Sequence, residues 1–221
     1  IETIELCQID SKDMTFAILK HMAVILNDLM QRDDVCGVVI THGTDTLEET
    51  GVFLNHTVVA TKPIVLTASM RPSTALSADG PLNLFDSLVL ATSGAQGIFA
   101  VVNNTIYLAD EIVKSHTMKV DGFYAGDYGA IGHMYNVNVE FFRNVKHSNK
   151  MNVSLEALPD NDLDYPWVEI VNSDVSANPA LIKLLVDNGV DGLIINGTGN
   201  GTIHTNFLSA LHQCERTIPV V

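Results

Sequence analysis

The spacing of apolar residues predicts alternating strands and helices along most of the chain. Residues 13–32 place apolar side chains at the 3.6-residue period of a helix that packs on a sheet: Met14, Ile18, Met22, Ile25 and Leu29. The other expected elements are strands at 36–40, 64–68, 98–102 and 105–108 and helices at 47–56 and 82–91. This alternation is typical of an α/β domain in which helices flank a mainly parallel sheet.

A second and shorter α/β pattern follows a polar stretch. Residues 144–166 are rich in Ser, Asn, Asp and Pro and are expected to form a linker. Beyond it the pattern predicts strands at 167–171, 192–195 and 218–221 and helices at 179–188 and 206–214. We therefore expect a large N-terminal domain (1–143), the linker and a smaller α/β C-terminal domain (167–221).

The run from Val38 to Thr50 predicts a site at the end of a strand. The strand at 36–40 is β-branched, as is usual for a central strand covered on both faces. Gly43 permits a tight turn, and the helix that follows begins with a capping-box pattern, Thr46 and Glu49. Thr44 and Asp45 are then held where a ligand can lie, or they merely cap the helix.

A second strand ends in the same way. Residues 63–69 are apolar up to a small hydroxyl residue, Ser69, and a loop leads from there to the next helix. In that loop Arg71 is expected to be structural, tied to Asp79 or to the backbone. Asn103 and Asn104 separate two strands and tolerate positive φ, which favours a hairpin turn.

Together these runs resemble the bacterial-type L-asparaginase and glutaminase-asparaginase family, with a type II-like pattern. The matching motifs are Thr41-His42-Gly43-Thr44-Asp45-Thr46 with Glu48-Glu49-Thr50, Ser69-Met70-Arg71-Pro72 with Ser77-Ala78-Asp79-Gly80-Pro81, and Gly199-Asn200-Gly201. The resemblance runs in register from about Ile9 to the end of the chain. It implies an amidohydrolase that converts L-asparagine, with L-glutamine as a candidate second substrate, to the acid and ammonia through a threonine acyl-enzyme.

One part of the family pattern is absent from the 221 residues. The family opens with a strand and a Thr-Gly-Gly-Thr-Ile-Ala type turn that carries the first catalytic threonine, and the sequence contains no such turn. The family's C-terminal acidic residue would also lie beyond Val221. We therefore expect a chain that is incomplete at both ends and inactive by itself.

The resemblance implies the catalytic residues Thr44, Asp45 and Lys114. A threonine hydroxyl is a poor nucleophile at neutral pH and needs a base or a nearby cation. An inward-facing Lys114 beside Asp45 can relay a proton from Thr44 or from a water molecule. Judged without the resemblance, the favoured interpretation of Lys114 is an ordinary surface lysine at a strand edge, the commoner location of lysine.

The resemblance also implies the residues that bind substrate. Asp45 would hold the α-ammonium, and Ser11 would donate to the α-carboxylate unless it only caps a helix. The backbone carbonyl of Ser69 would lie beside the amide nitrogen. Asn200 would reach the site of a neighbouring subunit in a homotetramer built as a dimer of dimers, although Asn-Gly is also a favoured turn. Lys12 replaces the glutamine that often follows the serine in this family.

Charge and composition exclude some of the alternative partners and functions. The formal charge of −14, with 12 Lys and Arg against 26 Asp and Glu, argues against nucleic acid as a partner and against an amidotransferase subunit that acts on transfer RNA. The alternative that the protein is a catalytically dead homologue that binds amino acids is not excluded by charge or composition. No nucleotide or metal motif is present, so no cofactor is expected.

The compartment is expected to be the periplasm or the exterior, with the cytoplasm as the alternative. No apolar run reaches the roughly 18 residues that span a membrane. Cys7, Cys36 and Cys214 are widely spaced and are interpreted as core thiols, so they do not decide the compartment.

Overall fold

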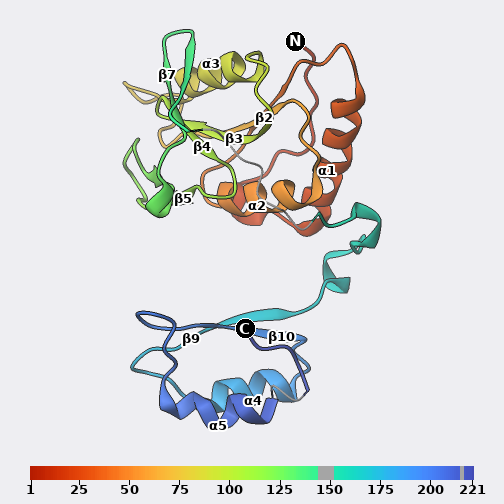
Figure 1. Ribbon diagram of the computed structural model, residues 1–221, viewed down its shortest axis with the longest axis vertical. Helices are drawn as coiled ribbons and strands as arrows, with labels where there is room; N and C mark the ends of the chain where they lie inside the picture. The colour runs from red at the N-terminus through yellow and green to blue at the C-terminus, as the bar shows by residue number, and fades with distance from the viewer. Residues whose placement is uncertain (144–151, 215–216) are drawn as a thin grey trace. The chain divides into compact units, whose positions relative to one another are not determined.

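The computed structural model describes residues 1–143, 152–214 and 217–221, which form two compact units (Figure 1). The first unit is Ile1–Asp162 and the second is Leu163–Val221. Each contains parallel strands and helices, so the α/β class expected from the sequence is confirmed. The boundary between the units falls within the expected linker 144–166, of which 144–151 lies outside the described residues.

A six-stranded sheet forms the centre of the first unit, in the order β1, β2, β3, β4, β7, β8. Its strands are β1 (Val38–Thr41), β2 (Pro63–Thr67), β3 (Gly97–Val102), β4 (Thr105–Leu108), β7 (Gly132–Tyr135) and β8 (Asn138–Phe141). β1, β2 and β3 pair in parallel, and the other three strands extend the sheet in antiparallel fashion. A separate antiparallel ribbon is formed by β5 (Val113–Lys114) and β6 (Phe123–Tyr124).

Helices cover both faces of the parallel part of this sheet. They are α1 (Phe16–Gln31), α2 (Leu47–Thr57) and α3 (Gly80–Ala91). α1 and α2 lie on one face and α3 lies on the other (Figure 1). Because successive side chains of a strand point to opposite faces, Ile64 and Leu66 pack with α1 and α2 while Val65 packs with α3.

β1 is covered on both faces as the sequence predicts, because Val38 and Ile40 pack with the α1 and α2 cluster and Val39 packs with the α3 cluster, but it is not a central strand. Among the described residues it pairs with β2 alone and forms the edge of the sheet, and Val38, Val39 and Ile40 are only half-buried. Beyond this edge lies a cavity of about 1130 Å³, lined by residues of 1–9, α1 and α3. The prediction of a central position was wrong because β-branched residues indicate a strand but not whether both of its edges are paired.

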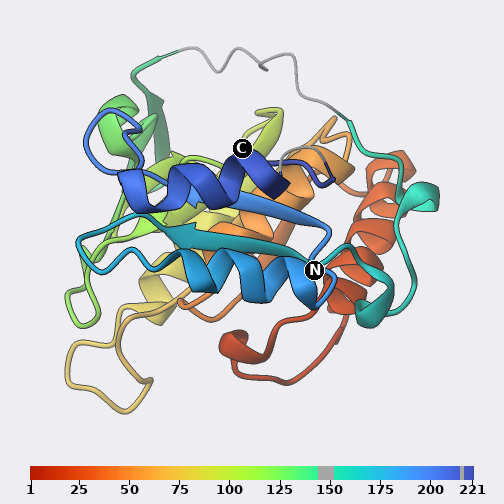
Figure 2. The same ribbon diagram turned by 90° about the horizontal axis from the view of Figure 1, so that it is seen from below.

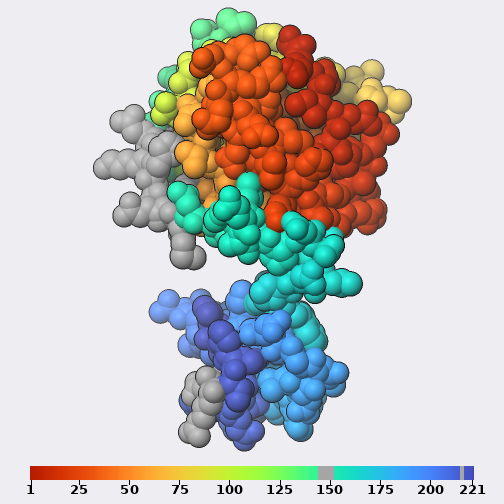
Figure 3. Space-filling view, turned by 90° about the vertical axis from the view of Figure 1, so that its right-hand side faces the viewer, coloured from red at the N-terminus to blue at the C-terminus, as the bar shows by residue number. Residues whose placement is uncertain are grey.

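α1 begins at Phe16 instead of residue 13. Ser11–Asp13 form a short 3-10 turn, and the Thr15 hydroxyl then accepts the N–H of Ile18 at 3.3 Å as a helix cap. The buried stripe is also rotated by about one residue from the predicted one and consists of Leu19, Met22, Ala23, Leu26 and Met30. In the space-filling view of Figure 3, α1 and the N-terminal segment form one face of this unit.

The hairpin turn between β3 and β4 is confirmed. Asn103 and Asn104 have φ values of 51° and 58°, a left-handed conformation that asparagine tolerates better than most residues. The Asn83 side chain in α3 accepts the N–H of Asn103 at 2.9 Å, which fixes the turn to the helix.

Residues 155–162 are fastened to α1. The Lys20 ammonium donates to the Leu158 carbonyl and forms an ion pair with Asp160, both at 2.6 Å. The Asp162 carboxylate accepts the N–H of Ala17 at 2.9 Å. These contacts place this stretch in the first unit.

The second unit is a smaller α/β structure. Its elements are β9 (Val168–Asn172), α4 (Pro179–Asp187), β10 (Gly192–Asn196) and α5 (Thr205–Cys214). β9 and β10 pair in parallel, and α4 and α5 lie side by side on one face of them (Figure 2). The strand expected at 218–221 is present as a single bridge between Leu193 and Val220.

The interpretation of the cysteines as core thiols was wrong for two of the three. Cys7 and Cys36 are exposed, whereas Cys214 is buried. Cys7 lies in a segment without regular structure and Cys36 precedes β1, so neither belongs to a buried face.

Candidate active site

The turn after β1 places Thr44 and Asp45 at the carboxyl end of the parallel strands. Thr41 of β1 lies opposite Thr67 of β2, so the loops that follow the two strands leave the sheet at the same edge. Gly43 is required in this turn because a Cβ there would lie 2.4 Å from the Ser11 hydroxyl oxygen. The close approach brings the segment before α1 against the segment before α2.

Lys114 reaches this turn from β5. Its ammonium donates to the Thr44 hydroxyl at 2.8 Å and to the Asp45 carboxylate at 2.5 Å. The Lys114 side chain is 19% exposed, so it is not the surface lysine of the alternative interpretation, while Asp45 is 51% exposed. The three residues that the sequence analysis names as catalytic therefore lie together, with Asp45 accessible to a ligand.

Ser11 adjoins the same turn. It is 4% exposed, its hydroxyl accepts the N–H of Asp45 at 3.2 Å, and its carbonyl accepts the Thr46 hydroxyl at 2.7 Å. The Ser11 hydroxyl keeps its own hydrogen for donation, because its contact with Asp45 uses only the oxygen as an acceptor.

The capping box predicted at the start of α2 was wrong. Thr46 is the N-cap residue, but its side chain makes no capping hydrogen bond, because its hydroxyl turns to Ser11 instead. A long-range partner thus replaces the local one that the sequence pattern suggests.

Ser69 follows β2 at the same edge of the sheet. Its side chain lies close to Gly80, because a Cβ added to this glycine would be 3.3 Å from the Ser69 Cβ. The Asp79 carboxylate accepts the N–H groups of Met70 at 2.8 Å and Arg71 at 2.9 Å, and the Arg71 guanidinium donates to the Ser77 carbonyl. The structural role expected of Arg71 is confirmed.

Asn200 lies in the second unit, in the turn closed by the bridge between Thr198 and Thr202. Gly199 and Gly201 on either side have positive φ values of 52° and 79°. The structure therefore accounts for the turn expected at Asn200.

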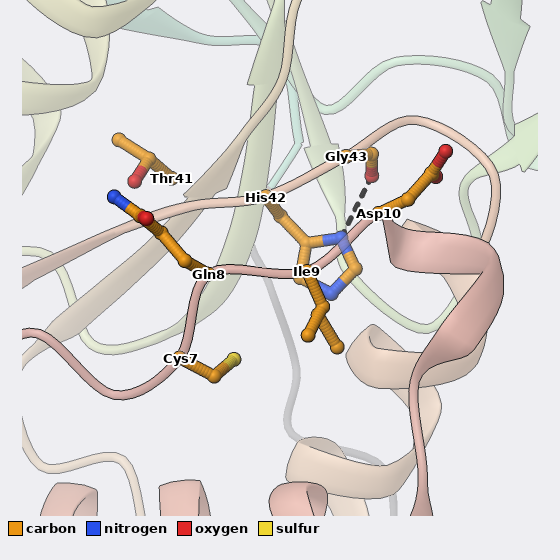
Figure 4. Close-up of a pocket in the computed structure, with 7 residues that line it drawn as sticks. All are labelled: Cys7, Gln8, Ile9, Asp10, Thr41, His42 and Gly43. Carbon is orange, nitrogen blue, oxygen red and sulfur yellow. Dashed lines mark hydrogen bonds between the residues drawn. The ribbon is translucent and has the colours of Figure 1, made fainter.

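His42 lies in the turn after β1 and holds it by two hydrogen bonds of its ring. The sequence alone predicts no role for this residue. Its Nδ1 lies 2.7 Å from the Gly43 carbonyl (Figure 4). Its Nε2 lies 2.9 Å from the Thr50 hydroxyl. Because a carbonyl can only accept, Nδ1 carries the proton and Nε2 of the neutral ring accepts from Thr50. Burial lowers the pKa of His42 more than its bond to the Gly43 carbonyl raises it.

This lowered pKa predicts a pH-dependent stability. The folded protein binds fewer protons at His42 than the unfolded chain, so this contribution to the free energy of unfolding is complete above about pH 6.5 and is lost as the pH falls below that value. His42→Gln is expected to flatten the pH dependence between about pH 6.5 and 5, measured by denaturant unfolding. The control is His21→Gln on the exposed side of α1. If the free energy of unfolding depends on pH with the same slope in both variants and in the unchanged chain, the prediction is wrong.

The described residues contain no group of three or more His, Cys, Asp and Glu side chains placed to hold a metal ion. Within the same residues, no helix has the length and apolar character needed to cross a membrane.

A family model described as asparaginase, N-terminal, matches residues 1–147. The chain belongs to the asparaginase family. A glutaminase-asparaginase of Acinetobacter glutaminasificans is 39% identical to this family member over 94% of the chain and 63% of the relative. A probable periplasmic L-asparaginase of Haemophilus influenzae is 33% identical over 98% of the chain and 62% of the relative.

A solved relative shares the fold. The crystal structure of a probable cytoplasmic L-asparaginase from Campylobacter jejuni superposes with a TM-score of 0.87 at 35% identity, over 97% of this chain and 67% of the other. This asparaginase-family chain thus spans about six-tenths of the length of the curated relatives that it matches.

Proposed function

We propose that the complete gene product containing these residues hydrolyses the side-chain amide of L-asparagine, with L-glutamine as a candidate second substrate. The observation that carries the proposal is the meeting of Thr44, Asp45 and Lys114 around one ammonium group, although Lys114 is 70 and 69 residues from the other two. Membership of the asparaginase family supports the amide as the substrate group, and the Acinetobacter relative is named for both amides.

In the proposed reaction a threonine hydroxyl attacks the amide carbon. The family carries this threonine in the opening turn that the 221 residues lack. The threonine oxygen bonds to carbon as its proton passes to a base, and the C–N bond breaks as the amide nitrogen takes up a proton and leaves as ammonia. Water then adds to the acyl-threonine ester, and the C–O bond to threonine breaks to release the acid.

Thr44, Lys114 and Asp45 are proposed to move protons during the attack or during deacylation. A cation 2.8 Å from the Thr44 oxygen stabilises the hydroxyl in its deprotonated form. Asp45 holds this ammonium in place. Because the Lys114 side chain is only 19% exposed, its charge is screened less than it would be at the surface, and its effect on a developing negative charge is correspondingly larger.

The same proposal assigns substrate binding. The half-exposed Asp45 carboxylate would hold the α-ammonium, and the Ser11 hydroxyl would donate to the α-carboxylate. The Ser69 backbone carbonyl would face the amide nitrogen from the end of β2. Asn200 would serve the site of a neighbouring subunit in a homotetramer, an assembly that rests on the family resemblance alone. The periplasm or the exterior is the proposed compartment, and the cytoplasm is the alternative, since the named relatives include both kinds.

Ammonia release from L-asparagine and L-glutamine by the purified complete gene product tests the proposal. We expect ammonia and the corresponding acid in equal amounts. Equilibrium binding of the amino acids without ammonia release would instead indicate the catalytically dead binding homologue. If the protein neither binds these amino acids nor releases ammonia from them, both proposed functions are wrong.

A further inference from the structure

The backbone of Lys114 is held by a side chain that the proposed reaction does not otherwise use. The Glu48 carboxylate accepts the Lys114 N–H at 2.7 Å. Glu48 is half-buried and lies in the first turn of α2, three positions after Asp45. The segment 44–48 therefore contacts Lys114 at both ends, through Thr44 and Asp45 at its ammonium and through Glu48 at its amide.

The strand that carries Lys114 has little other support. β5 is two residues long, and within the part of the chain that the structure describes it pairs with the two residues of β6 alone. Ser115 donates its N–H to the Gly122 carbonyl at 2.8 Å. Because alternate residues of an antiparallel strand direct their N–H groups to opposite sides, the Lys114 N–H points away from the ribbon and toward Glu48. The carboxylate thus satisfies an amide that the ribbon does not.

The location of Glu48 suits this task. A carboxylate in the first turn of a helix is favoured by the helix dipole, and a hydrogen bond to an ionised acceptor is stronger than one to a neutral group. Glu49 is adjacent and equally charged but exposed, and within the described residues its side chain makes no hydrogen bond or ion pair. The two glutamates therefore form a matched pair for comparison.

We propose that Glu48 is a positioning residue that holds the Lys114 backbone so that the ammonium stays between Thr44 and Asp45. The value of this role for catalysis rests on the proposed amide hydrolysis, whereas the contact itself does not. Glu48 reaches no reacting atom in this arrangement and acts only through Lys114.

Hydrogen exchange of the Lys114 amide, measured by NMR on the purified chain, tests the contact. The unchanged chain should protect this amide although β5 is so short. Glu48→Gln keeps an acceptor and should retain the protection, whereas Glu48→Met keeps the length without an acceptor and should accelerate exchange roughly tenfold or more. Glu49→Met should change nothing. An unprotected Lys114 amide in the unchanged chain would overturn the proposal whether or not any variant folds.

A second measurement follows the Lys114 ammonium. The rate of its modification by an amine-directed acylating reagent, relative to that of exposed Lys119, should rise in Glu48→Met and stay unchanged in Glu48→Gln and Glu49→Met. Equal rates in all of these proteins would overturn the positioning role.

The complete gene product separates the two proposals. If it releases ammonia, Glu48→Met should lower kcat about tenfold with little change in KM, and Glu48→Gln should restore most of the rate. Ammonia release that is unaffected by Glu48→Met would remove the positioning role and leave the proposed function. No ammonia release from the unchanged protein, with the exchange and labelling results as expected, would remove the function and leave the contact.

Discussion

Lys114→Met is expected to lower the rate of ammonia release by the complete gene product about 100- to 10,000-fold, the range usual for loss of a proton-transferring group. Methionine keeps much of the side-chain length and removes the ammonium. The Thr44 hydroxyl then loses its cation at 2.8 Å, and Asp45 loses its ion-pair partner at 2.5 Å. We expect the loss mainly in kcat, because the ammonium acts on charge that develops during the reaction.

Lys119→Met is the control for this variant. Lys119 follows on the loop between β5 and β6, is exposed and carries the same charge. Its replacement should leave kcat and KM within about twofold of the unchanged protein, as is usual for surface substitutions that keep stability within ±0.5 kcal/mol. If Lys114→Met retains activity equal to that of Lys119→Met, the proposed role of the lysine is wrong.

Gly51→Ala is expected to destabilise the first unit by about 2 kcal/mol or more, although it replaces glycine within a helix. Helix propensity alone predicts the opposite sign, a gain of up to about 1 kcal/mol. The structure reverses this expectation because a Cβ on Gly51 would lie 2.0 Å from the Ala109 backbone carbonyl oxygen. No flexible side chain can give way there, so α2 would have to move from the segment that leads to Lys114.

Denaturant unfolding followed by far-ultraviolet circular dichroism checks this prediction. Val52→Ala, on the exposed side of α2, is the control and should change the free energy of unfolding by less than about 0.5 kcal/mol. Trp167 is the single tryptophan and lies in the second unit, so its fluorescence reports that unit. An unchanged or raised midpoint for the first unit in Gly51→Ala would contradict the close approach of α2.

The strand-turn-helix after β1 could be predicted from the sequence because all its signals are local. A β-branched run, a glycine and the start of an amphipathic helix lie within residues 38–57, and α2 begins at the predicted residue. The trio around Lys114 could not be found in this way. Nothing local indicates that Lys114 faces Thr44 across 70 residues of sequence, and only the family resemblance suggested it.

The contacts that the sequence did not predict are those made by backbone groups or by long-range partners. Thr46 turns to the Ser11 carbonyl instead of capping its own helix, and Glu48 accepts a backbone N–H 66 residues away. Backbone donors are the same in every residue type, so no sequence pattern identifies which one a carboxylate will bind. The rotated stripe of α1 has a related cause, since the 3-10 turn and the Thr15 cap determine where the helix begins.

The edge position of β1 also bears on how this chain behaves at high concentration. Unpaired N–H and C=O groups along a strand are a template for pairing with another copy, and here, among the described residues, they border an apolar cavity. The charge of −14 keeps copies apart, but salt screens such repulsion to within about 10 Å at 0.1 M. The colloidal stability of the chain therefore depends on ionic strength, and low salt favours the dispersed protein.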